Sequence, residues 1–148
     1  MSDRATPCPD GRIEVTGRDV TRITRQLAVE PWQFADVVRT ARDDPAGIAL
    51  DRGPHRHRLV LQRDTTGDCV FLLRMNDGTA RCGLGALRPA SCGGEASDDG
   101  FTRTIRSWNE YATRCGRDAA FTSRDFLRYV LDVEVALQRS PEGWRSEP

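Results

Sequence analysis

The first part of the chain carries a helix signal followed by an apolar stripe. Thr16 is followed three residues later by Asp19, which is typical of a capping box at the start of a helix. The apolar residues after this box share one helical face: Val20, Ile23 and Leu27. The pattern predicts a first helix of about ten residues.

A second helical stripe begins at Pro31, a residue suited to the first turn of a helix. Its apolar members are spaced i, i+3, i+4 and i+7: Phe34, Val37, Val38 and Ala41. We expect this second helix to end near Arg42, before an Asp-Asp-Pro sequence.

Two more helices are predicted in the last third of the chain. The apolar face of the third is closed by Gly116 and consists of Phe101, Ile105, Trp108, Ala112 and Cys115. Ser123 is suited to cap the fourth, whose inward face consists of Phe126, Val130, Val133 and Leu137. An acidic, glycine-rich stretch at residues 93–100 separates these two helices from the rest.

Strands are predicted between the two helical parts. Residues 57–62 and 69–75 have strand composition, and Asn76-Asp77-Gly78 is a strong hairpin turn that leads into residues 80–84. The pattern predicts an α+β fold: a small, mostly helical domain of about four helices, with a β-hairpin that carries a cysteine metal site. We expect one domain over residues 1–148, with a metal-binding part at 1–92 and a helical pair at 101–139.

Composition excludes several classes of function. The formal net charge is zero and 38% of the residues are hydrophobic, so neither a membrane nor a nucleic acid is an expected partner. All 22 basic residues are arginines, and the absence of lysine excludes Schiff-base chemistry and the Walker phosphate loop. The two histidines, His55 and His57, are too few for a three-histidine zinc site, but they alternate so that both would face one side of a strand and could bind a metal. A solvated strand face is the simpler interpretation.

The cysteines carry the clearest chemistry. The first residues contain no apolar run that could act as a signal sequence, so we expect a cytoplasmic protein, in which an odd count of five cysteines argues against a disulfide framework. Four of them supply the number of thiolates that a tetrahedral zinc or a cubane iron–sulfur cluster needs: Cys8, Cys69, Cys82 and Cys92. The alternative is that these are small buried apolar residues. Cys115 is a candidate for a fifth ligand or a redox partner, but it lies on a helical stripe and core burial is the favoured interpretation.

The spacing of the later cysteines resembles that of a known family. Cys69-Val-Phe-Leu is followed by Cys82 and, after nine residues, by Cys92, with Arg88-Pro89 before the last cysteine. This arrangement resembles the YkgJ family of cysteine-cluster proteins, which chelate zinc or iron and share the patterns C-x-F-L and C-x-I-Y-x-x-R-P-x-x-C. The resemblance covers about residues 6–92. It departs from the family where an N-terminal run of four cysteines is reduced to Cys8.

The resemblance implies one closed site made by the four cysteines and leaves open whether it holds a cluster of the 4Fe–4S type or Zn²⁺. A related cysteine motif occurs in bacterial flagellin lysine methylases that carry an iron–sulfur cluster. We expect Arg88 to support the site, since its guanidinium can bond cluster sulfurs or a carboxylate; binding of an anionic substrate is the alternative.

Three functions are compatible with the sequence. The first is a metal-binding protein with a structural or redox-accessory role. The second is a metal-dependent modifying or group-transfer enzyme, in which the cysteine site supports a substrate pocket beside the C-terminal helices. Its candidate polar groups are Asp19, Arg22, Arg88 and Glu110, and no pairing of nucleophile and base is visible among them. The third is an adaptor that binds a protein partner.

Overall fold

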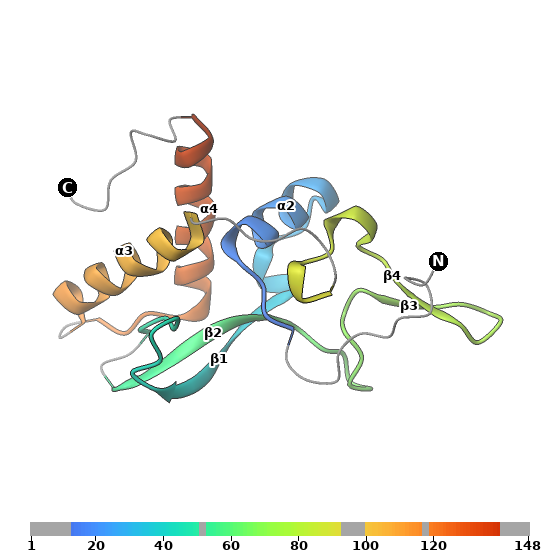
Figure 1. Ribbon diagram of the computed structural model, residues 1–148, viewed down its shortest axis with the longest axis horizontal. Coiled ribbons are helices and arrows are strands. Elements are labelled where there is room, and N and C mark those ends of the chain that lie inside the picture. Colours follow the sequence, from blue (N-terminus) through green and yellow to red (C-terminus); the bar gives the residue numbers. More distant parts are fainter. Residues whose placement is uncertain (1–12, 51–52, 93–99, 117–118, 140–148) are drawn as a thin grey trace.

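The computed structural model describes residues 13–50, 53–92, 100–116 and 119–139. Within these ranges there are three α-helices and two small antiparallel sheets (Figure 1). The helices are α2 (Gly17–Leu27), α3 (Gly100–Cys115) and α4 (Ser123–Arg139). One sheet pairs β1 (Ala35–Arg42) with β2 (His55–Leu61), and the other pairs β3 (Leu72–Arg74) with β4 (Ala80–Cys82). The described residues also form three short 3₁₀ helices: η1 (Pro31–Gln33), η2 (Gly85–Leu87) and η3 (Ala90–Cys92).

The prediction of a mostly helical domain with about four helices is wrong. In the second predicted helix only Pro31–Gln33 is helical, as η1, and the residues after it form β1. Val37 and Val38 fit a helical stripe, but their β-branched side chains also suit a strand. Pairing with β2 decides between the two, because the register that joins Ala35 to Leu61 satisfies the backbone hydrogen bonds of both segments.

The first predicted helix is confirmed as α2. The Thr16 hydroxyl accepts the Asp19 N–H at 3.2 Å, and the Asp19 carboxylate accepts the Thr16 N–H at 3.0 Å. This reciprocal box satisfies two donors that a helix start otherwise leaves without partners. Val20 and Ile23 are buried as expected, whereas Leu27, the last residue of α2, is 41% exposed.

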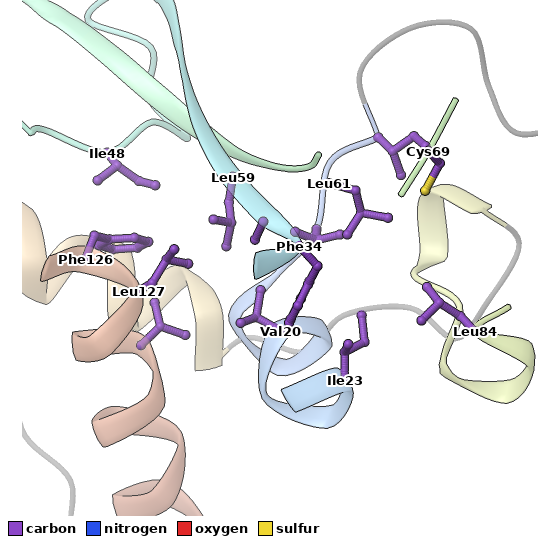
Figure 2. Packing of buried hydrophobic residues seen from close by; sticks show 14 of the residues in the cluster. Val20, Ile23, Phe34, Ile48, Leu59, Leu61, Cys69, Leu84, Phe126 and Leu127 are labelled. Carbon is purple, nitrogen blue, oxygen red and sulfur yellow. The ribbon is translucent and has the colours of Figure 1, made fainter. Parts of the chain in front are cut away.

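The core extends between α4, α2 and the β1–β2 sheet. In Figure 2, Phe126 of α4 and Ile48 lie at one end of the buried cluster, and Cys69 and Leu84 lie at the other. Phe34 lies between them and packs against Phe71 with ring centroids 5.5 Å apart. Segments that lie far apart in the described sequence therefore contribute to one cluster.

The C-terminal helices are confirmed, with one change at a cap. Trp108 of α3 is buried among aromatic rings, the nearest centroids being those of Phe121 and Tyr129 at 5.0 Å. The cap of α4 is Thr122 and not Ser123: the Thr122 hydroxyl accepts the Asp125 N–H at 3.1 Å. None of the helices in the described ranges is both long and apolar enough to cross a membrane.

The β3–β4 hairpin turns where the sequence predicts it. Gly78 has φ of 90°, and the N–H of Met75 donates to the Thr79 carbonyl at 2.8 Å across the turn. The hairpin projects at the end of the molecule opposite to α3 and α4 (Figure 1). Its exposed apolar residue Leu73 keeps 51% of its surface accessible.

Candidate functional site

The three described candidate cysteines lie on three separate segments. Cys69 is buried and forms an isolated bridge with Arg63, before β3 begins. Cys82 is the last residue of β4, and its Sγ accepts the N–H of Leu84 at 3.4 Å. Cys92 is half-buried at the end of η3.

The predicted hairpin metal site is wrong. Within the described ranges, no three histidine, cysteine, aspartate or glutamate side chains lie close enough together to hold a metal ion. The hairpin carries only Cys82, because β3 begins three residues after Cys69. Cys8 lies outside the described residues. Thiols are therefore suitable metal ligands by their chemistry, but the described side chains do not gather around one point.

Arg88 adjoins the last cysteine segment without forming the contacts that we expected. It is the C-terminal cap of η2, and its backbone N–H donates to the Gly85 carbonyl at 3.3 Å. Its Nε atom is buried and has no hydrogen-bond partner in the described part of the chain. A buried donor without a partner costs about 1–3 kcal/mol, so Arg88 has an unused capacity to bind an acceptor.

Other candidate polar residues have structural roles. Asp19 is buried in the capping box and forms an ion pair with Arg22 at 3.0 Å. The ring nitrogens of the two histidines lie near backbone carbonyls: His55 Nδ1 is 3.4 Å from Thr40 O, and His57 Nδ1 is 3.2 Å from Ile48 O. These contacts are those of partly buried strand residues. They do not support the alternative of a histidine metal site.

Cys115 is half-buried in the last turn of α3, not fully buried as the helical stripe predicts.

A cleft of about 910 Å³ lies between α3 and the edge of the β1–β2 sheet. This volume is in the range of small-molecule sites. One wall is formed by residues 14–16, the 45–48 loop and β2, and the other by α3 from Phe101 to Arg114. Among the described residues that line it there is no cysteine, so the predicted pocket beside the C-terminal helices is not built around the thiols.

The sheet wall of the cleft is fixed by a charged network. Arg58 donates from Nε and Nη2 to the two carboxylate oxygens of Asp44 at 2.7 and 2.9 Å, and from Nη1 to Glu14 at 3.0 Å. The Arg58 hydrogen bonds hold the pKa of Asp44 far below its usual value, and the same bonds raise the pKa of Arg58. Both groups remain charged under all physiological conditions.

The helix wall is fixed by Asn109. Its Oδ1 accepts the Ala49 N–H at 2.8 Å, and its Nδ2 donates to the Gly47 carbonyl at 3.1 Å. The neighbouring Trp108 adds a bond from Nε1 to the Ala49 carbonyl at 2.8 Å. These three bonds join α3 to the loop before β2 and hold the cleft in a preformed shape.

A further polar pair packs behind the helix. Ser107 and the Tyr129 hydroxyl are hydrogen-bonded. Burial raises the pKa of Tyr129, the bond with Ser107 opposes this, and the charge of Glu110 adds to the rise. Tyr129 therefore stays neutral and serves in the packing of α3 on α4.

Among the residues that line this cleft, only Glu110 is a candidate functional group in the sequence. Asn109 carries a usable signal, since a polar residue next to the buried Trp108 needs partners. The pairing of Arg58 with Asp44 has no local signal, because 14 residues separate them. No family model, curated protein or solved structure matches the chain. The likeness to the YkgJ family thus depends on the residues quoted from the sequence.

Proposed function

We propose that this chain binds one metal centre through Cys8, Cys69, Cys82 and Cys92. The centre is an iron–sulfur cluster of the 4Fe–4S type or a zinc ion, both of which four thiolates can hold. A closed four-thiolate site keeps no open position for a substrate, so the proposed role is structural or redox-accessory. The proposed compartment is the cytoplasm, where thiols stay reduced.

The observation that carries this proposal is that the three described thiols border the same core. Cys69 belongs to the buried cluster, and Cys82 and Cys92 pack against it from β4 and η3. The thiols are not gathered as ligands in the described structure, so the proposal requires their segments to close around the metal. Metal binding commonly supplies folding free energy of this kind.

One donor contacts a candidate thiol, and a second donor lies on the chain segment between Cys82 and Cys92. The Leu84 N–H already donates to Cys82 Sγ, and the buried Arg88 Nε has no partner in the described ranges. Hydrogen bonds to sulfur stabilise the thiolate charge, and they tune the reduction potential of a cluster or the affinity for a metal ion. Arg88 would thereby gain the acceptor that its buried Nε lacks.

The length of chain between Cys8 and Ile13 allows the fourth proposed ligand to approach Cys69. The Ile13 carbonyl accepts the Leu61 N–H at 2.9 Å, and the next residue, Gln62, accepts the Val70 N–H at 3.0 Å, directly after Cys69. Five residues separate Cys8 from Ile13, and an extended chain of that length spans at most about 17 Å. Cys8 can therefore approach Cys69 without any change in the sheet.

Anaerobic purification with elemental analysis and a visible spectrum tests the proposal. Iron with broad visible absorbance indicates a cluster, and stoichiometric zinc without colour indicates a zinc site. We expect Cys82→Ser to lose most of the metal and to melt at a lower temperature, because metal-binding free energy is also folding free energy. The matched control is Cys115→Ser, which removes a half-buried thiol outside the proposed site.

A chelator separates the metal effect from simple packing. If Cys82→Ser acts through the metal, chelated wild-type protein melts at the same temperature as the variant. A wild-type protein that takes up neither metal under replete conditions, or equal metal loss in both variants, would show that the four-cysteine assignment is wrong.

A further inference from the structure

The cleft between α3 and the sheet combines an apolar floor with a charged rim. Its apolar lining comes from both walls: Val15, Ile48, Leu59, Phe101 and Ile105. Phe101 and Ile105 are only partly buried, so they present hydrocarbon surface to an occupant. An apolar cleft with few polar groups is the usual form of a small-molecule site.

The cations of the rim differ in their partners. The charge of Arg58 is already compensated by Asp44 and Glu14. In the described part of the chain, by contrast, Arg106 and Arg114 form neither a hydrogen bond nor an ion pair, although both line the cleft. The cleft side of α3 thus presents Arg106 and Arg114 with the carboxylate of Glu110 between them in the sequence, which leaves this wall with a net positive charge.

The position along α3 and the helix dipole both favour Arg106 as the cation that binds the anion. Arg106 and Arg114 are eight residues apart, which is about 12 Å along a helix, so one small anionic group reaches only one of them. Arg106 directly follows the apolar Ile105, whereas Arg114 lies in the last turn of α3. The negative end of the helix dipole makes that last turn the less favourable place for an anion.

We propose that the cleft binds a small organic acid. Its aromatic or aliphatic body lies on the floor formed by Val15, Leu59 and Ile105, and its single anionic group pairs with the Arg106 guanidinium. The site is preformed, because the Asp44–Arg58 network and the Asn109 bonds fix both walls. This inference does not depend on the proposed metal centre, which shares no described residue with the cleft.

A pair of fluorescent probes with one shape tests the charge assignment. Anilinonaphthalene sulfonate is an aromatic anion, and phenylnaphthylamine has the same kind of aromatic body without the charge. We expect wild-type protein to bind both and to prefer the sulfonate by about tenfold, which corresponds to roughly 1.4 kcal/mol.

Three variants locate the site. Arg106→Gln should abolish the preference for the sulfonate and leave the neutral probe unchanged, and the matched control Arg103→Gln, on an exposed position of α3 outside the cleft, should keep it. Thr102→Trp introduces a large ring at an exposed position that lines the cleft, and it should weaken the binding of both probes. Such dyes also bind proteins whose core packing is loosened. Urea unfolding of each variant therefore serves as a control that shows whether its core is intact.

Three results would overturn the inference. The first is that neither probe binds the folded wild-type protein, and the second is that both probes bind Thr102→Trp with unchanged affinity. The third is that Arg103→Gln loses as much sulfonate affinity as Arg106→Gln, which would reduce the effect to the overall charge of the helix.

Discussion

Asp44 offers the sharpest test of how this fold is stabilised. Its side chain is only 8% exposed and accepts four hydrogen bonds, two from Arg58 and one each from the Thr40 hydroxyl and the Ala46 N–H. These bonds join the end of β1, the loop after it and β2. Asp44→Asn keeps the size of the side chain but replaces one acceptor oxygen by an N–H₂ group that faces the Arg58 donors.

The expected loss in the free energy of unfolding lies between the values for surface and buried ion pairs. Exposed pairs contribute at most about 1 kcal/mol, whereas charge-assisted bonds in less exposed places contribute about 1.5–3 kcal/mol. Asp44 is nearly buried but Arg58 is 32% exposed, so we expect Asp44→Asn to lower the free energy of unfolding by about 2 kcal/mol at pH 7. For a chain of this size that is a fall in melting temperature of about 4–8 °C.

The pH dependence distinguishes the charge from the packing. The folded-state pKa of Asp44 lies below the value of about 3.9 for an unfolded aspartate. Its contribution is therefore complete above that pH and is lost as the pH falls through the folded-state pKa. The difference between wild type and Asp44→Asn should shrink to less than half between about pH 4 and pH 2.

The neighbouring Asp43 provides the matched control. It is exposed and has φ of 56°, a conformation that asparagine also tolerates. Asp43→Asn removes the same charge from the same loop and should change stability by less than about 0.5 kcal/mol at every pH. Urea denaturation followed by tryptophan fluorescence measures both variants. A deficit for Asp44→Asn that is as large at pH 2 as at pH 7, or equal effects of the two substitutions, would refute this explanation.

Two further substitutions test local elements of the fold by urea denaturation. Thr16→Ala removes the hydroxyl that caps α2 and should cost about 1 kcal/mol, and no measurable change would mean that the capping box does not stabilise this helix. Asn109→Ala leaves the Ala49 N–H and the Gly47 carbonyl without their partners and should cost about 2 kcal/mol. The adjacent Glu110→Ala should have little effect, and similar losses for both would show that Asn109 does not join α3 to the loop.

Elements with local signals could be predicted from the sequence. The box of Thr16 and Asp19 fixes the start of α2 through contacts three residues apart, and Gly78 fixes the hairpin turn through its own backbone conformation. The second predicted helix failed for the opposite reason. Val37 and Val38 satisfy a helical stripe and a strand equally well, and the partner strand that decides between them begins 17 residues later.

The two candidate sites also differ in how much of each can be predicted from the sequence. The cysteine pattern is visible along the chain because thiols are few and their spacing is compact, but spacing does not specify how side chains gather in space, and the hairpin assignment failed on that point. The cleft has no compact pattern at all. Its walls come from residues 14–16, from β2 and from α3, and only tertiary packing brings them together.

The segment before α2 joins these two regions of the molecule. The Glu14 side chain binds Arg58 at the wall of the cleft, and its backbone carbonyl accepts a hydrogen bond from Ser91 at 2.8 Å, next to Cys92. Ile13 and Val15, on either side, hydrogen-bond to β2 and are buried. The contacts of Glu14 therefore join the segment that ends in Cys92 to the wall of the cleft that Arg58 forms, and this connection depends on tertiary packing that no local pattern in the sequence predicts.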